Sequence, residues 1–280
     1  MKKMMAIFAH PDDEGAIGGS LAHYAAQADC DVMLVCATRG EVGEISDPSL
    51  ATPEILGEVR QQELEAACAA LGVQHLRFLD YRDSGMEGTP PNEDPRALIQ
   101  ADPTEAVGKI VHLIREYQPD IVITFEPYGW YGHPDHKIIS QWATAAYFQA
   151  VDKDTEDLLG PVWQPAKLYH AVVPMTQFKT VVNYAIKNGL LEETWAGFGT
   201  DEAIAMATEA QVTHKLDVRA YGDKRQMATA AHATQFGEDH FFRRIPVDML
   251  NEVTGYDYFI QVWPEPEEAW RAEALSDLFD

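Results

Sequence analysis

The feature of this sequence that most constrains its fold is a regular alternation of short apolar runs with longer segments of helical pattern. Apolar runs of strand length occur at 4–9, 31–38, 75–81 and 120–125. Between them, apolar residues recur at helical spacing in 14–28, 52–71 and 102–117. Strands that alternate with helices favour βαβ units with parallel strands and right-handed connections. The sequence therefore predicts an α/β fold, with a Rossmann-like, mostly parallel sheet and helices on both faces.

The second half of the chain is less regular, and it predicts decoration of this core. Helices are expected at 137–151, within 176–210 and at 221–234, strands at 167–173, 209–218 and 259–263, and an acidic helix at 265–280. There is no internal repeat and no low-complexity linker. A chain of this length can form one α/β domain. We therefore expect a single domain over 1–280, with a core at about 4–175 and substrate-side and C-terminal additions at 176–280.

Charge and cysteine content restrict the partners of the protein. It has 21 Lys and Arg against 45 Asp and Glu, a net charge of −24. Nucleic-acid binding needs basic side chains against phosphates, so we expect no such partner. No apolar run approaches the roughly 18 residues of a membrane span. Cys30, Cys36 and Cys68 match no metal-binding or disulfide pattern and are expected to be buried thiols. These features predict a cytoplasmic protein with a small-molecule partner; assembly as a homo-oligomer stays open.

Two polar clusters follow predicted strands. AHPDDE, residues 9–14, comes at the end of the first strand, and HPDH, residues 133–136, comes after the fourth. In open parallel sheets, ligands bind outside the carboxyl ends of the strands, where the strand order reverses. If the strand order is 3-2-1-4, the first and fourth strands are neighbours. The two clusters would then meet in one crevice, although more than a hundred residues separate them.

The composition of the two clusters suits a metal ion. A catalytic zinc takes three protein ligands, commonly imidazole nitrogens and carboxylate oxygens, and leaves the fourth position for water. Two histidines and one aspartate supply this set, and a remaining carboxylate can act as the general base. A single His-Pro-Asp sequence also forms turns. Two such clusters, each at a predicted strand end, favour a metal site.

AHPDDE and HPDH together resemble the LmbE/PIG-L family of zinc-dependent N-deacetylases, which hydrolyse the acetamide of N-acetylglucosamine in glycosyl inositols, thiol-sugar precursors and related compounds. Other segments are also similar to the family: TRGE at 38–41, Arg60 and Glu63 with ALG at 70–72, and AHATQ at 231–235. Residues 81–86 and 131–133 are similar to the branch that contains the mycothiol deacetylase and the mycothiol S-conjugate amidase. The resemblance spans about 5–236. It implies a metal-dependent amide hydrolase that acts on an amino-sugar conjugate.

The resemblance also implies roles for single residues in the catalytic centre. It implies that His10, Asp13 and His136 bind Zn²⁺, with Fe²⁺ or another divalent metal as the alternative in the cell. Asp12 would be the general base.

Further roles follow from the same resemblance. His133 would protonate the leaving amine or stabilise the oxyanion, Asp135 would orient His133 and favour its charged form, and Tyr131 would help to polarise the carbonyl. Substrate contacts are implied for Arg60 and Asp83, which would hold sugar or inositol hydroxyls, for Met86 beside them, and for His232.

Several alternatives stay open. Arg60 could instead form a salt bridge with Glu63, three residues further along its helix. His232 could pack against its helix rather than line the site. For Glu14, the sequence favours a carboxylate stabilised by the dipole of a first helical turn over a contact with the site. The function could also be that of an amidase for another small N-acyl or S-conjugate substrate, or of a non-catalytic metal-binding module.

Overall fold

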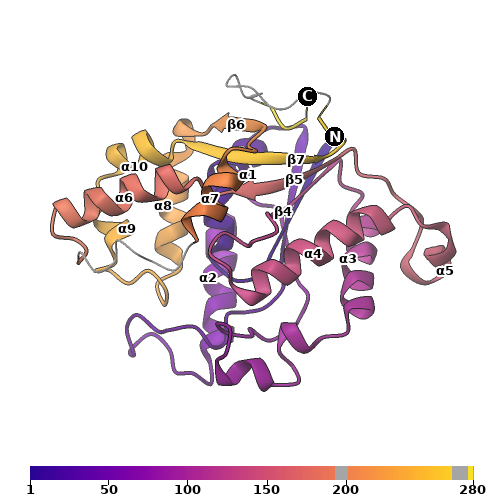
Figure 1. The fold of residues 1–280 in the computed structure, drawn as a ribbon, viewed down its shortest axis with the longest axis horizontal. Helices are drawn as coiled ribbons and strands as arrows, with labels where there is room; N and C mark the ends of the chain where they lie inside the picture. The colour runs from indigo at the N-terminus through magenta and orange to yellow at the C-terminus, as the bar shows by residue number, and fades with distance from the viewer. Residues whose placement is uncertain (193–200, 267–276, 280) are drawn as a thin grey trace.

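The structure is a computed structural model that describes residues 1–192, 201–266 and 277–279. In this part of the chain, seven strands form one sheet in the order β3-β2-β1-β4-β5-β7-β6 (Figure 1). The parallel strands are β1 (Lys2–Phe8), β2 (Cys30–Cys36), β3 (His75–Phe78), β4 (Ile121–Phe125) and β5 (Lys167–Val172). The predicted strand order 3-2-1-4 and the mostly parallel Rossmann-like sheet are confirmed.

Helices cover both faces of this sheet. The crossover helices are α1 (Gly18–Ala25), α2 (Leu56–Leu71), α3 (Pro103–Tyr117) and α4 (Pro134–Gln149). Figure 1 shows α3 and α4 together on one side of the strands and α2 on the other, where α2 also contacts α1. Short helical turns are η1 (Asp13–Ile17), η2 (Pro90–Glu93), η3 (Leu98–Gln100), η4 (Lys153–Thr155) and α5 (Glu156–Leu159). The helix expected at 14–28 is therefore split into η1 and α1.

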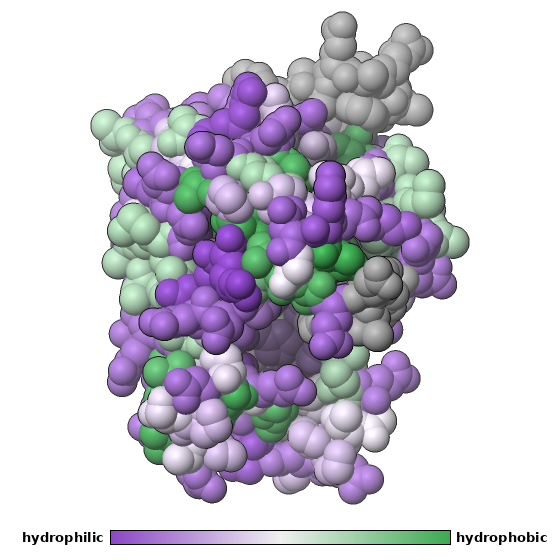
Figure 2. Space-filling view, turned by 90° about the vertical axis from the view of Figure 1, so that its left-hand side faces the viewer, coloured by the Kyte–Doolittle hydropathy of each residue, from purple (hydrophilic) through white to green (hydrophobic). Residues whose placement is uncertain are grey.

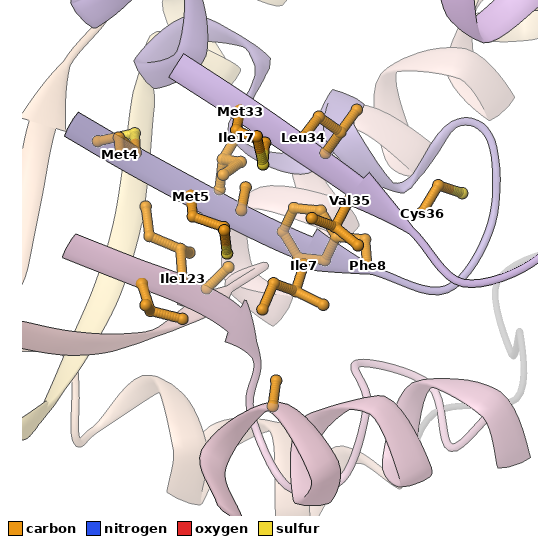
Figure 3. Close-up of a cluster of buried hydrophobic side chains, with 14 of the residues drawn as sticks. Met4, Met5, Ile7, Phe8, Ile17, Met33, Leu34, Val35, Cys36 and Ile123 are labelled. Atoms are coloured by element: carbon orange, nitrogen blue, oxygen red, sulfur yellow. The ribbon is translucent and has the colours of Figure 1, made fainter. Parts of the chain in front are cut away.

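The core lies along β1, which is buried on both faces. Every side chain from Met4 to Phe8 is at most 1 % exposed. Figure 3 shows the β1 side chains between those of β2, such as Val35, and Ile123 of β4. A parallel strand that is covered on both faces needs a continuous apolar run rather than an alternating one. The carboxyl end of β1 is consequently held rigidly where the AHPDDE cluster begins.

The C-terminal strands join the same sheet with the opposite direction. β7 (Tyr256–Trp263) lies between β5 and β6 (His214–Asp217) and pairs antiparallel with both. The strand expected at 209–218 was predicted too long, since β6 begins only at His214. Glu209 instead ends the helix α7 (Glu202–Glu209). The remaining described elements are α6 (Met175–Lys187), η6 (Arg219–Tyr221), α8 (Gly222–Ala231), α9 (Phe241–Arg244) and α10 (Val247–Thr254). Most of the acidic helix expected at 265–280 falls outside the described residues.

Three further expectations can be compared with the structure. The helix expected at 137–151 begins earlier, at Pro134, because Nδ1 of His133 accepts a hydrogen bond from the Asp135 N–H at 3.2 Å and caps it. The three cysteines are buried free thiols, as predicted. None of the helices that the structure describes combines the length and the apolar character needed to cross a membrane.

Candidate active site

The two polar clusters meet at the carboxyl edge of the sheet. β1 pairs with β4, so the chain leaves both strands side by side and His10 comes to lie against His136. The loop after β3 adds Asp83, whose carboxylate reaches His10 from the other side of the imidazole. The side chains of His10, Asp83 and His136 are all buried. The predicted convergence of the two clusters is therefore present in the fold.

The three proposed metal ligands lie pairwise close together, and Asp13 faces His136 with Oδ1 and His10 with Oδ2. Nδ1 of His10 lies 3.1 Å from Nε2 of His136, and Oδ1 of Asp13 lies 3.2 Å from the same Nε2. Nδ1 of His10 and Oδ2 of Asp13 are 3.6 Å apart. Two ligands of a tetrahedral zinc are about 3.3 Å apart, because each lies roughly 2.0–2.1 Å from the metal. The donor set of this site fits a small divalent cation.

Hydrogen bonds on the far side of each imidazole orient the two histidines. Nδ1 of His136 lies 3.2 Å from the carbonyl oxygen of Gly129, so an N–H there leaves Nε2 as a lone-pair donor. Nε2 of His10 lies 3.2 Å from Oδ2 of Asp135 and 3.5 Å from Oδ1 of Asp83, which leaves Nδ1 free to face His136. Metal-binding histidines typically donate their second N–H to a carbonyl or a carboxylate in this way.

The carboxylate of Asp13 is held by the backbone. Its Oδ2 accepts hydrogen bonds from the N–H groups of Ala9 and His10, at 3.1 and 2.7 Å. The other oxygen, Oδ1, is thereby directed at His136. Burial acts to raise the pKa of Asp13, but His136 and His10 lower it below its usual value. The aspartate is therefore kept as an anion, the form that binds a cation.

Other groups near the three ligands could also contact a metal. Nitrogens of His10, His133 and His136 lie within 4.8 Å of one another, and so do ligand atoms of His10, Asp83 and Asp135. The second group would use Nε2 of His10, which is already shared between two carboxylates. Burial acts to lower the pKa of His10, but the surrounding carboxylates, Asp83 first, raise it well above its usual value. This field of negative charge also favours a bound cation.

Asp12 occupies a strained backbone position between the two ligands of its own cluster. Its φ is 111°, a left-handed conformation that is rare for a residue with a side chain, and such strain is found mainly at functional sites. Its carboxylate does not cap η1, the helical turn that follows. Burial and the neighbouring Asp13 raise the pKa of Asp12 to about 7. The side chain is thus available for proton transfer beside the candidate metal site.

Glu14 and His232 form a buried pair behind Asp12. Oε1 of Glu14 lies 2.7 Å from Nε2 of His232, and both side chains are 1 % exposed. Oε2 of Glu14 accepts a hydrogen bond from the Asp12 N–H at 3.0 Å. The preferred prediction for Glu14 was incomplete: the residue does start a helical turn, but its carboxylate points into the protein and supports the strained loop. Sequence analysis missed this because His232 is 218 residues away.

The structure gives Asp135 a second partner besides His133. Oδ2 of Asp135 accepts from the Ser84 N–H at 3.0 Å and lies 3.2 Å from Nε2 of His10, so it orients His10, and its predicted role in orienting His133 stays a prediction. Burial and the nearby His10 and His136 lower the pKa of His133 to about 4, while Asp135 acts in the predicted direction and raises it. Since Nδ1 of His133 accepts a backbone hydrogen bond, the neutral ring presents Nε2–H as a donor.

A tight loop between β4 and α4 positions Tyr131. Glu126 organises this loop, since its two carboxylate oxygens accept from the N–H groups of Tyr128 and Trp130, each at 2.6 Å. Gly129 has φ +72°, and a Cβ there would lie 2.6 Å from Cβ of His136. The ring of Tyr131 lies 5.0 Å from that of His136. Sequence analysis missed Glu126, because a glutamate directly after a strand gives no signal of the loop it holds.

Arg60 does not form the salt bridge with Glu63 that the sequence left open. Its guanidinium donates to the carbonyl oxygens of Gly40 and Glu44, at 2.8 and 2.9 Å. Glu63 accepts instead from the N–H and the hydroxyl of Thr234, at 2.7 and 2.6 Å. Both side chains are buried, and together they join α2 to the loop after β2 and to the AHATQ segment. A substrate contact for Arg60 stays a prediction.

Two other predicted substrate residues, Asp83 and Met86, lie on the loop after β3. Oδ1 of Asp83 accepts from the Gly85 N–H at 2.8 Å, and burial is outweighed by His10, which keeps the pKa of Asp83 well below its usual range. Met86 is 49 % exposed two residues before the left-handed Gly88. The loop therefore presents an anion and an exposed apolar side chain next to His10. Contact of either with a substrate stays a prediction.

A cavity of about 250 Å³ adjoins this centre on the side of Asp12. Asp12, Glu14 and His232 line one end of it, and the other walls come from α6, α8, α10 and β7. Figure 2 views the molecule from the side that carries α6, α9 and α10, where the surface is hollowed near its centre and hydrophobic side chains lie beside the hollow. The C-terminal additions thus enclose space next to the AHPDDE cluster.

Comparison with known proteins agrees with this geometry. The 1D-myo-inositol 2-acetamido-2-deoxy-alpha-D-glucopyranoside deacetylase of Acidothermus cellulolyticus is 39 % identical over 271 residues, which cover 93 % of this chain and 88 % of the relative. The N,N'-diacetylchitobiose deacetylase of Pyrococcus horikoshii has a similar structure, with a TM-score of 0.64 and 20 % identity over 93 % of this chain and 84 % of that one.

The fold is also shared with a different enzyme. The 4-carboxy-2-hydroxymuconate hydratase of Pseudomonas putida has a TM-score of 0.63 and 19 % identity, with 97 % of this chain and all of that chain covered. The fold alone consequently does not fix the reaction. The family model of GlcNAc-PI de-N-acetylase matches residues 5–147, which include both polar clusters. Together with the relative at 39 % identity, this match shows that the chain belongs to the PIG-L family of de-N-acetylases.

Proposed function

We propose that this protein is a zinc-dependent N-deacetylase that removes the acetyl group from N-acetylglucosamine linked to inositol. The observation that carries the proposal is the meeting of His10, Asp13 and His136 at ligand spacing, with the carboxylate of Asp12 next to them. The relative from Acidothermus cellulolyticus, named as a deacetylase of a glucosaminide of inositol, supports the substrate class.

A divalent cation at this site would supply Lewis-acid chemistry, polarising the amide carbonyl and lowering the pKa of a water to about 7. Two imidazoles and one carboxylate suit zinc, which leaves a fourth position for water or substrate. Asp135 and the carbonyl of Gly129 fix the two imidazole rings that would hold the ion. The site is therefore formed before the cation arrives, apart from the loss of protons from its ligands.

Asp12 is the proton carrier in this proposal. Its carboxylate takes a proton from the water that attacks the amide carbon, and a new C–O bond forms. The same proton then passes to the amide nitrogen as the C–N bond breaks, so that the products are acetate and the free amine. General acid–base catalysis of this kind contributes about 10²–10⁴-fold. The strained backbone of Asp12 is held by Glu14, whose Oε2 accepts from the Asp12 N–H at 3.0 Å.

His133 and Tyr131 stabilise the negative charge that develops on the carbonyl oxygen. Neutral His133 can donate its Nε2–H, and this supports stabilisation of the oxyanion over protonation of the amine. Burial raises the pKa of Tyr131, as do the nearby carboxylates, so its phenol stays protonated and can donate as well. Donors that are fixed in place before the reaction stabilise the transition state more than donors that must reorganise.

The sugar and inositol would lie against the loop after β3. Asp83 offers a buried carboxylate that can accept a hydrogen bond from a sugar or inositol hydroxyl. A buried group of this kind binds a ligand with that hydroxyl much more strongly than an analogue without it. Met86 offers an exposed apolar face to the ring beside it.

An amine-release assay tests the proposal directly. The substrates are N-acetylglucosaminyl-inositol, free N-acetylglucosamine and the N-acetyl dipeptide of two alanines, each with the zinc-loaded protein and with protein treated with chelator. We expect amine release from the first substrate at the highest kcat/KM, loss with chelator and recovery on adding zinc. Faster cleavage of the peptide would support the alternative amidase instead, and bound metal without amine release from any substrate would reject an N-deacetylase.

A further inference from the structure

The cavity beside Asp12 is apolar along its walls and polar at one end. Its volume is about 250 Å³, and Asp12, Glu14 and His232 form the polar end. The apolar walls come from the end of β5, from α6 and from the segment between α8 and the end of α10, and they include Val173, Phe178, Val181, Phe236, Phe242 and Leu250.

Three of the polar side chains in the walls, those of Gln177, Arg225 and Asp257, contact the protein itself. Nε2 of Gln177 donates to the carbonyl of Val253 at 2.7 Å, and the guanidinium of Arg225 donates to the carbonyl of Thr254. Oδ2 of Asp257 accepts from the N–H and the hydroxyl of Ser20, both at 2.7 Å. Oδ1 of Asp257 has no hydrogen-bond partner among the described residues, but it lies 3.4 Å from the guanidinium of Arg225. Most of the polar atoms of these three side chains are therefore paired within the protein, and the apolar side chains between them favour an apolar ligand.

At the end formed by Asp12, Glu14 and His232, one buried nitrogen has no hydrogen-bond partner in the described part of the chain. The side chain of His232 is 1 % exposed, and its Nδ1 has no hydrogen-bond partner among the residues that the structure describes. A buried polar atom without a partner is unusual in a native protein and is commonly explained by an absent ligand or water. The cavity thus suits a molecule with an apolar tail and a polar group at Asp12 and His232.

We propose that this cavity holds the acyl group of the substrate, and that the protein removes N-acyl groups longer than acetyl. The inference rests on the proposed function, since it assigns the side of the amide that enters the cavity. The amide nitrogen carries the sugar and the carbonyl carbon carries the acyl group. The candidate sugar residues Asp83 and Met86 are not among the residues lining the cavity, whereas the proposed base Asp12 is.

The size of the cavity exceeds what an acetyl group needs. A methyl group is comparable to a water molecule, whose share of volume is about 30 Å³. The cavity of about 250 Å³ can therefore take several methylenes beyond the methyl of acetate. Each methylene transferred from water to apolar surroundings changes a binding constant by about fourfold. A chain that follows the apolar walls would gain this factor at each step until the cavity is filled.

A series of acyl chains on one sugar tests this assignment. The zinc-loaded protein is given glucosaminyl-inositol carrying an N-acetyl, N-butyryl or N-hexanoyl group, and kcat/KM is measured by amine release. We expect kcat/KM to rise by about fourfold per methylene from acetyl to hexanoyl. A fall from acetyl to hexanoyl would overturn the inference while leaving the N-deacetylase intact. Absence of amine release from all three would overturn the proposed function and this inference with it.

A second series separates the acyl group from the aglycone. N-acetylglucosamine is supplied as the methyl and as the hexyl glycoside, and we expect kcat/KM values within about twofold of each other. A gain with the hexyl glycoside that matches the gain expected for hexanoyl would place the aglycone in the cavity and contradict the proposal.

Variants in α10 test whether the preference for a longer acyl chain depends on the cavity. Val247 lines it, so Val247→Trp should remove the gain for hexanoyl and leave kcat/KM for acetyl within about twofold. Glu252→Trp on the same helix is the matched control, because Glu252 is exposed and is not among the lining residues. An unchanged acyl preference in folded Val247→Trp would contradict the proposal. If that variant does not fold, inhibition of the wild-type protein by hexanoate and by acetate decides: equal inhibition would contradict it.

Discussion

The loop after β1 carries its site residues in direct succession, from His10 to Glu14, whereas the chain beyond α5 contributes them singly. In the first region, a buried parallel strand ends at a fixed point and the next few residues must lie at the sheet edge. In the second region, α6, α8, α10 and β7 each add a few side chains to the wall of one cavity. Chemistry at strand ends is therefore concentrated in short motifs, while a cavity between helices is assembled from scattered positions.

The two regions are joined by polar contacts at the site itself. His232 binds Glu14, and Nε2 of Gln235 donates to the carbonyl of Pro11 at 2.7 Å. Asp257 of β7 binds Ser20 at the start of α1. The C-terminal region consequently supports the loop that carries the chemistry, in addition to enclosing the cavity.

The largest effect is expected from the loss of a metal ligand in the first region. His136→Ala removes one imidazole of the proposed set and leaves His10 and Asp13 without their common neighbour. We expect loss of stoichiometric zinc and amine release below detection, measured by elemental analysis and by the assay. Full retention of zinc by this variant would show that His136 is not a ligand.

The second-largest loss of activity is expected from a change at Asp12. Asp12→Asn keeps the shape of the side chain but cannot accept a proton, so kcat should fall by about 10²–10⁴-fold. Zinc content should remain that of the wild type. Turnover close to normal would make Asp12 a structural residue of the strained loop and would move the proton carrier elsewhere.

A smaller effect is expected at Asp135, which orients a ligand without being one. Asp135→Asn weakens the support of His10, and the loss of such a partner typically costs about 10–100-fold in metal affinity or activity. Competition with a chromophoric chelator measures the zinc affinity. If affinity is unchanged and only the pH dependence of kcat shifts, the prediction that Asp135 acts on His133 would be supported.

The contact between the two regions is tested at His232. His232→Ala removes the 2.7 Å contact with Glu14 and frees the carboxylate that holds the Asp12 N–H. Because a hydrogen bond to a charged group contributes about 1.5–3 kcal/mol, we expect roughly a tenfold loss in kcat with zinc retained. Unchanged kcat for the acetyl substrate would mean that the C-terminal region encloses the cavity without supporting the loop.

The smallest effect on activity is expected at Arg60. Arg60→Ala removes the guanidinium that donates to the carbonyls of Gly40 and Glu44, and leaves Gly40 with only the Gly43 N–H at 3.3 Å, so the free energy of unfolding should fall by about 2–4 kcal/mol. Urea unfolding measures this loss. We expect kcat/KM for the inositol conjugate and for free N-acetylglucosamine to change by the same factor. A selective loss for the inositol conjugate would instead support the predicted contact of Arg60 with substrate hydroxyls.

Much of the fold was accessible from local patterns. The apolar run of β1 and the helix that starts with Asp102 and Pro103 carry their structure in a few adjacent residues, and both are present. Asp102 caps α3 by accepting from the N–H groups of Thr104 and Glu105. The limits of the C-terminal elements were less predictable, as at α7 and β6, because short segments there take their structure from neighbours distant in the sequence.

By itself, the sequence determined the α/β class and the presence of two polar clusters at strand ends, because strand periodicity and strand-end motifs are local properties. The strand order 3-2-1-4, which brings the two clusters together, was assumed from the sequence and is confirmed by the sheet topology. Tertiary structure decided which group each polar side chain serves. The carboxylate of Asp135 contacts His10, and that of Glu14 contacts His232. The guanidinium of Arg60 donates to loop carbonyls. A buried polar side chain must find a partner wherever the fold places one, and that choice depends on segments far apart in the chain.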